Sequence, residues 1–340
     1  LAKTRPDDLA AEVIKALIAK TGVKPADIED LILGCAFPEG EQGFNMGRMV
    51  ALLAGLPKSV AGQTVNRWCG SSMEAIHIAA GNIATGKGEV FIAAGVESMT
   101  RIPMGGYNPL PNPALYKTMP EAYISMGLTA ENVAKRFHVP RAAQEEFALA
   151  SHRKAAAADF SAEIVPIATK AGVVTVDGTI RSNSTAEDLA KLNPAFDVYG
   201  TVTAGTSSPL TDGAAAVLVA SEDYARAHGL QPLARIKSMA VVGLDPAVMG
   251  LGPISASQKA LARAGLSIKD IDVIELNEAF AAQSMPCISE LGCPIEKVNI
   301  EGGAIALGHP LGASGARITG KAALLLSRSK GKYALATACI

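Results

Sequence analysis

A single cysteine stands at the start of a predicted helix, in the stretch TVNRWCGSS (Thr64–Ser72). The residues before it, GQTVN, are typical of a β-strand, and the small apolar run SSMEAIHIAAGNIA after it is typical of a helix. The first turn of a helix has unpaired backbone N–H groups and a partial positive charge, which favour a thiolate and lower the pKa of a thiol placed there. Cys69 is therefore a candidate nucleophile, although cysteine is also one of the most buried residue types and a packing role stays open.

A histidine lies in a second distinctive stretch, the glycine-rich GGAIALGHPLGASGA (Gly302–Ala316). Its glycines do not match the G-x-G-x-x-G of a dinucleotide-binding turn, and no Gly-Lys-Ser/Thr follows them as in a phosphate-binding loop. Glycine at this density lets the backbone approach a ligand closely. His309 is either an exposed loop residue or a general base, and its own surroundings in the sequence leave both interpretations open.

Two further candidates follow predicted buried strands. Cys339 comes at the end of the apolar run that starts at Tyr333, and Asn277 follows the run Ile271–Leu276. Strand ends at a topological crossing are where α/β proteins bind ligands. The remaining cysteines have neither C-x-x-C spacing nor a partner histidine, so we predict that they pack in the core and that the chain has no metal site. These core cysteines are Cys35, Cys287 and Cys293.

The elements that must position these residues are duplicated. Residues Lys20–Phe37 align without a gap on Arg263–Phe280, a shift of 243 positions, with six identical pairs. Each copy reads as a helix, a turn, a buried strand, a long loop, a second helix and a second strand. The same shift places Cys69 on Gly312, so the starts of two helices occupy equivalent places. Two such starts that meet at a pseudo-twofold axis would form one site.

Length and composition predict several structural units. At 340 residues the chain exceeds one ordinary core, and 49% hydrophobic with only 4% aromatic residues predicts helices packed closely on sheets through small side chains. We predict an N-terminal half from residues 1–100 and 203–225, an inserted domain over 101–202, and a C-terminal half over 226–340. The insertion is rich in Pro and Gly near its start, contains a helical stretch over Ala130–Ala158, and is typical of a segment that carries specificity.

The charge and the cysteine count exclude some classes of protein. A net charge of −1 gives no electrostatic case for nucleic acid or an anionic membrane as a partner. The longest apolar runs are far shorter than the ~18 residues of a membrane span. Five scattered cysteines indicate a reducing compartment rather than a disulfide framework.

Four stretches of the chain together resemble the signatures of the thiolase family, in the family's order. They are VNRWCGSSM around Cys69, NEAFAAQ at Asn277, GGAIALGHPLGASGAR around His309 and LATACI at Cys339. The likeness covers essentially the whole chain and is closest to the degradative 3-ketoacyl-CoA thiolases. It implies an α/β fold of the thiolase type, in which two duplicated halves form a five-layered αβαβα arrangement with an inserted loop domain.

The resemblance implies thiolytic cleavage of a 3-ketoacyl-CoA by CoA, as in fatty-acid β-oxidation. Cys69 would carry the acyl group as a thioester, with His309 as its base. Cys339 would protonate the departing carbanion and then activate the incoming CoA thiol. Asn277 would orient a water that forms an oxyanion hole with His309. CoA and acyl-CoA would enter as substrates, and no prosthetic group is implied.

The same resemblance assigns a set of binding residues. Ser208 would contact the pantetheine of CoA, and Arg181 would lie near its nucleotide. A turn serine and a solvated arginine remain the alternatives for these two. Met126, Ala279 and Phe280 would line the thioester pocket.

The family also implies partners, a location and additional chain. A homodimer or homotetramer is expected, and a hydratase/dehydrogenase subunit of a β-oxidation complex is an expected partner. The expected location is the bacterial cytoplasm, or the mitochondrial matrix or peroxisome in a eukaryote. Against the family pattern the chain begins at Leu1 within the first helix and stops at Ile340 before a glycine-rich stretch, so we expect residues to be missing at its ends or internally.

Three other functions stay open at this point. A biosynthetic acetoacetyl-CoA thiolase usually carries a histidine just before the Met-Gly of the inserted domain, where this chain has Ser125. A Cys-His hydrolase, with Asn277 orienting His309, would leave Cys339 idle. A non-catalytic acyl-CoA carrier would not need both cysteines and the histidine. These differences favour degradative thiolysis.

Overall fold

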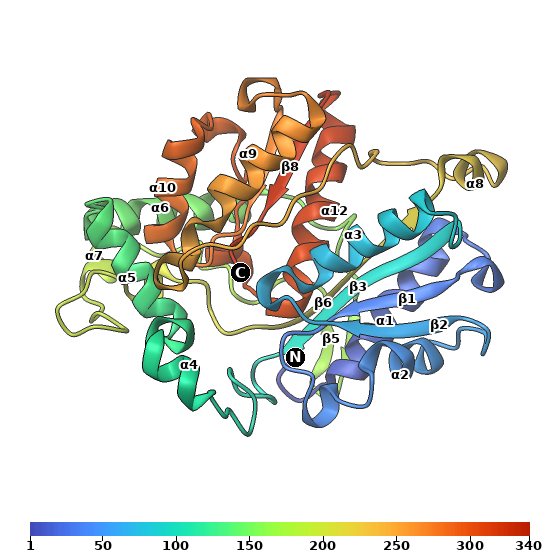
Figure 1. Cartoon of the computed structure of the whole chain (residues 1–340), viewed down its shortest axis with the longest axis horizontal. Helices are drawn as coiled ribbons and strands as arrows, with labels where there is room; N and C mark the ends of the chain where they lie inside the picture. The colour runs from blue at the N-terminus through green and yellow to red at the C-terminus, as the bar shows by residue number, and fades with distance from the viewer.

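The structure is a computed structural model that describes residues 1–340. Parallel strands form the centre of each of its two halves (Figure 1). The first half is built on a four-stranded sheet in the order β2-β1-β3-β6. In it β1 (Asp30–Gly34) lies between β2 (Ala61–Val65) and β3 (Val90–Ser98) and is parallel to both. The fourth strand, β6 (Asp212–Ala220), is antiparallel to β3.

Helices cover both faces of this sheet, which explains why every residue of β1 and β3 is buried. α1 (Pro6–Thr21) and α2 (Met46–Leu53) pack on one face. α3 (Ser71–Ala84) packs on the other, beside α12 (Leu311–Ser329) from the second half. α3 and α12 therefore form a central layer that both halves share (Figure 1).

The second half repeats this plan with fewer strands. β7 (Val273–Leu276) and β8 (Ala334–Thr337) form a parallel pair, and α9 (Gly252–Ala264) and α10 (Ala281–Leu291) pack with them. The 243-residue shift carries β1 onto β7, β3 onto β8 and α3 into α12, so the predicted duplication is present in the structure. It carries β2 onto the short helix α11 (Ala304–Leu307) instead of a strand.

The segment between the halves has its own helices. The helical stretch predicted over Ala130–Ala158 is in fact two helices, α5 (Met126–Arg136) and α6 (Arg141–Ala157). His138 between them has a left-handed backbone with φ of 51°, and Pro140 has no N–H for a continuous helix, so the chain breaks there. The smaller elements are α4 (Pro113–Thr118), the antiparallel pair β4 (Ile167–Thr169) and β5 (Gly172–Val174), α7 (Ala186–Ala190) and, after β6, α8 (Glu222–Ala227).

α3 and α12 cross so closely that only glycine fits at the contact. A Cβ on Gly315 of α12 would lie 2.2 Å from the backbone nitrogen of Met73 in α3. The backbone N–H of Ala316 donates to Ser72 Oγ at 2.8 Å across the same crossing. The crossing places the start of α12 beside the start of α3, as the internal repeat predicts.

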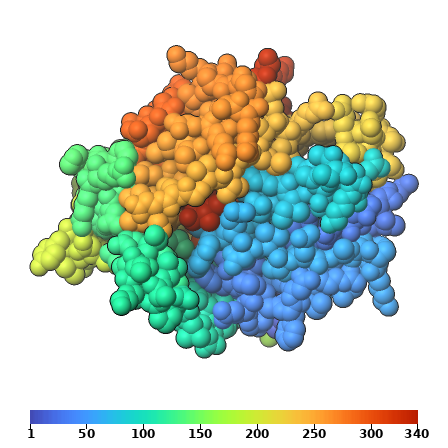
Figure 2. Space-filling view, viewed as in Figure 1, coloured from blue at the N-terminus to red at the C-terminus, as the bar shows by residue number.

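The junction between the two halves reaches the surface at the C-terminal end of the chain. Figure 2 shows this end (red) between the first half (blue to cyan), the second half (orange) and the inserted segment (green). Ile340 is 39% exposed there, whereas Cys339 beside it is fully buried.

Candidate active site

The four residues predicted to do chemistry lie at strand ends and helix starts at the junction of the two halves. Cys69 is in a short 3-10 turn directly before α3, and His309 lies two residues before α12. Asn277 directly follows β7, and Cys339 follows β8. Each of the four is at most 4% exposed.

The two cysteines belong to one site. A Cβ on Gly70, next to Cys69, would lie 2.7 Å from Cδ1 of Ile340, the residue after Cys339. A charge on Cys339 also acts on Cys69 and raises its pKa, as expected for neighbouring thiols. Met126 packs against the apolar clusters of both cysteines.

Two hydrogen bonds fix the imidazole of His309. The Ser314 hydroxyl donates to the Pro310 carbonyl oxygen at 3.1 Å, so its oxygen accepts from His309 Nδ1 at 2.6 Å. The proton therefore resides on Nδ1, and the lone pair of Nε2 accepts from Asn277 Nδ2 at 3.2 Å. Burial lowers the pKa of His309 to about 3, so the imidazole is neutral and Nε2 is a proton acceptor.

The first half shows why Ser314 is free to make this contact. Its counterpart under the 243-residue shift, Ser71, accepts the backbone N–H of Arg67 at 2.9 Å. Arg67 corresponds to Pro310, and proline has no N–H to donate. The proline therefore leaves a lone pair of Ser314 available to the imidazole.

Burial sets the protonation of both thiols. It raises the pKa of Cys339 to about 12. It also raises the pKa of Cys69 well above its usual value, and the backbone N–H at the helix start only partly opposes this. The expectation that the helix start lowers the pKa of Cys69 is therefore wrong for the buried thiol, because desolvation outweighs the helix-terminus effect. The site holds two neutral thiols and a neutral imidazole, so each thiol must lose its proton as it reacts.

Asn277 has an unused hydrogen-bonding group in the same place. Its amide is fully buried, and Oδ1 has no hydrogen-bond partner while Nδ2 donates to His309. A buried acceptor without a partner costs ~1–3 kcal/mol, so a donor from water or substrate is favoured at this oxygen. This geometry fits the water-orienting role that the sequence predicts for Asn277.

Comparison with known proteins identifies the family. The thiolase N-terminal domain model matches residues 1–223, and the thiolase C-terminal domain model matches residues 230–340. This chain belongs to the thiolase family. The predicted family and the α/β thiolase fold are thereby confirmed.

Curated bacterial proteins resemble this thiolase over nearly its whole length. It is 50% identical to a 3-ketoacyl-CoA thiolase of Saccharophagus degradans over 350 residues, which cover 99% of this chain and 89% of the relative. A 3-ketoacyl-CoA thiolase of Psychrobacter arcticus is 50% identical over 348 residues, with the same coverage. One from Shewanella frigidimarina is 51% identical over 350 residues, which cover 99% of this chain and 90% of the relative.

The structure brings most of the predicted binding residues of this thiolase to the same junction. Ala279 and Phe280 are buried in one apolar cluster with Cys339. The backbone N–H of Ser208 donates to the Ala279 carbonyl oxygen at 2.9 Å, so Ser208 lies against this loop. Arg181 differs from them: it is exposed, and its backbone N–H donates to a histidine of α6.

Two residues that support the site escaped the sequence reasoning. Ser314 lies in the first turn of α12, and only the five-residue spacing from His309 signals that it can reach the imidazole. Glu97 is 1% exposed near the end of β3 and accepts the backbone N–H of Gly312 at 2.9 Å. A carboxylate directly after the apolar run VFIAAGV was the available signal for it.

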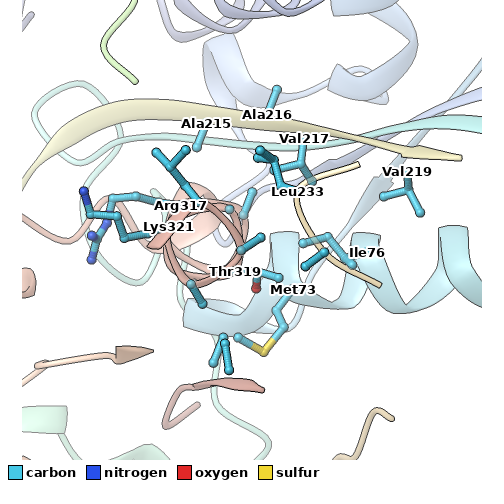
Figure 3. Close-up of a pocket in the computed structure, with 18 of the residues that line it drawn as sticks. Met73, Ile76, Ala215, Ala216, Val217, Val219, Leu233, Arg317, Thr319 and Lys321 are labelled. Carbon is cyan, nitrogen blue, oxygen red and sulfur yellow. The ribbon is translucent and has the colours of Figure 1, made fainter. Parts of the chain in front are cut away.

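Three further observations on this thiolase concern metal ions, membrane-spanning helices and a hollow outside the four-residue site. No group of three His, Cys, Asp or Glu side chains is arranged to hold a metal ion. None of the helices combines the length and the hydrophobicity that crossing a membrane requires. A large hollow runs between β6 and α12, and its lining includes Val217, Leu233 and Arg317 but none of the four candidates (Figure 3).

Proposed function

We propose that this thiolase cleaves a 3-ketoacyl-CoA with CoA and releases acyl-CoA and acetyl-CoA, as in fatty-acid β-oxidation. The observation that carries the proposal is the meeting of two buried thiols and a neutral imidazole at one junction. The names of the relatives, 3-ketoacyl-CoA thiolase, support the same reaction.

In the first half-reaction Cys69 is the nucleophile. Its Sγ attacks the C3 ketone as its proton passes to Nε2 of His309. The C2–C3 bond breaks, and its electron pair forms the carbanion of acetyl-CoA at C2. The thiol of Cys339 gives its proton to C2, which leaves a Cys339 thiolate and an acyl-thioester on Cys69. The protonated His309 and a water held by Asn277 donate hydrogen bonds to the enolate oxygen and together form its oxyanion hole.

In the second half-reaction Cys339 is the base. Its thiolate takes the proton of the CoA thiol, and the CoA sulfur attacks the thioester carbon. The bond to Cys69 breaks, and its sulfur recovers a proton from His309. Both cysteines end as neutral thiols, which is the state that their burial favours.

Specific residues favour this reaction over the alternatives. Ser125, where short-chain biosynthetic enzymes usually carry a histidine, accepts the backbone N–H of Leu128 and caps α5. A hydrolase has no use for Cys339, which is fully buried beside the candidate nucleophile. A passive carrier needs neither the fixed tautomer of His309 nor the two thiols.

CoA and acyl-CoA are proposed as substrates, and no prosthetic group is part of the proposal. Ser208 is proposed to contact the pantetheine, since its backbone lies against Ala279. Arg181 is proposed to lie near the nucleotide, since it is exposed and free of ion pairs. The pocket for the thioester is proposed at Met126 and Phe280, on the apolar clusters of the two cysteines.

A homo-oligomer is proposed from an open sheet edge. β2 pairs only with β1, so its other edge is available to a second copy. Large apolar side chains are exposed nearby, with Phe44 at 91%, Leu53 at 45% and Trp68 at 43%. Light scattering should give a dimer or tetramer for the wild type and a smaller species for Phe44→Glu. An unchanged mass in the variant would move the interface elsewhere.

The domain division, the location and a partner are also proposed. The chain is divided into an N-terminal half (1–100 and 203–225), an inserted domain (101–202) and a C-terminal half (226–340). This division follows the internal repeat and the separate helices of the insertion. The bacterial origin of the relatives supports the bacterial cytoplasm as the location. A hydratase/dehydrogenase subunit is the proposed partner, because that chemistry supplies a 3-ketoacyl-CoA.

The function is tested with Cys69→Ala, Cys339→Ala and the control Cys293→Ala. CoA-dependent loss of the 3-ketoacyl-CoA enolate absorbance is measured with C4 and C16 substrates. Either catalytic variant should lose about 10³-fold or more in kcat. Cys293→Ala should retain activity, since Cys293 packs in the separate core around β7. Mass spectrometry after incubation with acyl-CoA should detect an acyl group on the wild type and Cys339→Ala but not on Cys69→Ala.

Each alternative predicts a different result. Turnover of C4 alone would move the chain to the acetoacetyl-CoA class. Release of acid without CoA would indicate a hydrolase. Binding of acyl-CoA without turnover by the wild type would indicate a carrier and would overturn the mechanism.

A further inference from the structure

A buried carboxylate connects the two halves beside Cys69. Glu97, near the end of β3, accepts the backbone N–H of Ala36 at 2.8 Å and that of Phe37 at 3.3 Å, in the segment after β1. It also accepts from Gln42 Nε2 at 2.7 Å. From the second half, the backbone N–H of Gly312 in the first turn of α12 donates to Glu97 at 2.9 Å.

Burial raises the pKa of Glu97, and the hydrogen bonds from these four groups oppose that shift and favour the ionised carboxylate. All four groups are N–H donors, and they fill both oxygens: Oε2 takes Ala36 and Gly312, and Oε1 takes Phe37 and Gln42. The Cys35 thiol also donates to Oε1 at 3.7 Å, so the hydrogen of a protonated carboxyl would enter a place that offers it no oxygen acceptor. The start of α12 adds its partial positive charge, which stabilises an anion there.

The contacts also link the residues that react. Ala36 and Phe37 share one buried cluster with Cys69 and with Leu311, which is two residues after His309. Glu97 therefore hydrogen-bonds both to the segment that packs around Cys69 and to the helix that directly follows His309. No other side chain in the structure accepts N–H groups from both the segment after β1 and the start of α12.

We propose that Glu97 is a positioning residue for the thiolase reaction, which ties α12 to the segment after β1 and so fixes His309 relative to Cys69. This inference rests on the proposed function for its kinetic readout. Its second readout, the reactivity of the Cys69 thiol, needs no turnover.

The charge of Glu97 supplies that second readout. The titratable groups that act on Cys69 are Cys339 after β8 and Glu97 from β3, and both raise its pKa. The titratable groups that face Glu97 are two thiols. Cys35 follows β1, and its Sγ lies 3.7 Å from Oε1 of Glu97. Cys69 precedes α3. α12 faces Glu97 with a backbone N–H. Loss of the charge at Glu97 should therefore favour the Cys69 thiolate.

The test compares Glu97→Gln, Glu97→Asp and the matched control Glu131→Gln. Glu131 is a 2% exposed carboxylate of α5 that accepts the backbone N–H groups of Thr201 and Val202. We measure kcat, the melting temperature, and the pH profile of Cys69 alkylation by iodoacetamide, with the site identified by mass spectrometry. Both Glu97 variants should lose about 10- to 100-fold in kcat, because small misplacements of reacting groups are that costly.

The alkylation profile separates positioning from loss of structure. Its midpoint should fall in Glu97→Gln, and stay at the wild-type value in Glu97→Asp, which keeps the charge, and in Glu131→Gln. Unchanged kcat in both Glu97 variants would overturn the proposal, and so would equal alkylation midpoints in all proteins. If the wild type lacked thiolysis but the midpoint shifted in Glu97→Gln alone, the proposed function would fail while the effect of the Glu97 charge on Cys69 stood.

Discussion

At the scale of single residues, the site works through hydrogen bonds that fix protonation. The proton of His309 stays on Nδ1, and Nε2 keeps its lone pair, because Nδ1–H donates a hydrogen bond to Ser314 Oγ. Ser314 Oγ can accept this bond because Pro310 has no backbone N–H to donate to it. Asn277 Nδ2 then holds the ring from the other side. A base that must accept a proton from a neutral thiol depends on this arrangement.

Replacing Ser314 by alanine tests this dependence. Ser314→Ala removes the acceptor of the Nδ1 proton, so the ring can adopt the other tautomer and lose Nε2 as a base. We expect kcat to fall about 10- to 100-fold with little change in KM for CoA, measured by steady-state kinetics. The control is Ser257→Ala in α9, because Ser257 is 1% exposed and its hydroxyl has no hydrogen-bond partner. Equal activity of the two variants would show that Ser314 does not set the tautomer.

The sequence singled out the candidate catalytic residues but not their protonation states. The types and surroundings of Cys69, His309 and Cys339 left packing and surface roles open, and the resemblance of the four stretches to thiolase signatures selected them. Their burial comes from a junction between segments far apart in the chain, so the raised pKa of each thiol was not visible locally. Glu97 was missed for the same reason, since its partner Gly312 is 215 residues away.

At the scale of elements, the crossing of α3 and α12 sets the distance between the reacting groups. The repeat in the sequence predicted that these helix starts are equivalent, and the structure places them in backbone contact. The break between α5 and α6 was missed, because the apolar pattern continues across it while His138 and Pro140 interrupt the backbone. Periodicity reports which face is buried, and it says less about where a helix ends.

Gly315→Ala should destabilise the protein and reduce its activity. The added Cβ would lie 2.2 Å from the backbone nitrogen of Met73, so the helices must move apart. We expect a loss of about 1–3 kcal/mol in the free energy of unfolding, measured by urea denaturation, together with lower kcat. Gly81→Ala in the middle of α3 is the control, since its Cβ would meet nothing within 4 Å. That variant should be neutral or more stable by about 0.5–1 kcal/mol. A Gly315→Ala protein as stable as Gly81→Ala would contradict the close crossing.

At the scale of the whole molecule, the fold places titratable groups in the low-dielectric junction between its two halves. The duplication predicted this junction, because equivalent strands end and equivalent helices start on either side of it. The shortened second half was not predictable from the repeat, since the counterpart of β2 is the helix α11. Burial at this junction keeps His309 neutral, and the stability of the whole chain is thereby linked to pH.

The sign of this link follows from the pKa of His309 in the two states. Burial lowers it from 6.5 to about 3, so between these values the unfolded chain binds a proton that the folded chain does not. Stability from this group is therefore present above pH 6.5 and is lost as the pH falls through the window. From pH 7 to pH 5 the loss amounts to about 2 kcal/mol in the free energy of unfolding.

We expect His309→Asn to lose less stability on acidification than the wild type. The melting temperature is measured from pH 7 to pH 5 for the wild type, His309→Asn and the control His138→Asn, whose histidine is exposed and whose left-handed backbone suits asparagine. Burial also lowers the pKa of His77 and His152, so the variant should keep part of the acid dependence. Only the slope for His309→Asn should flatten. Parallel slopes in all three proteins would mean that His309 takes up its proton in the folded state, and the neutral base that the mechanism requires would be absent at mildly acidic pH.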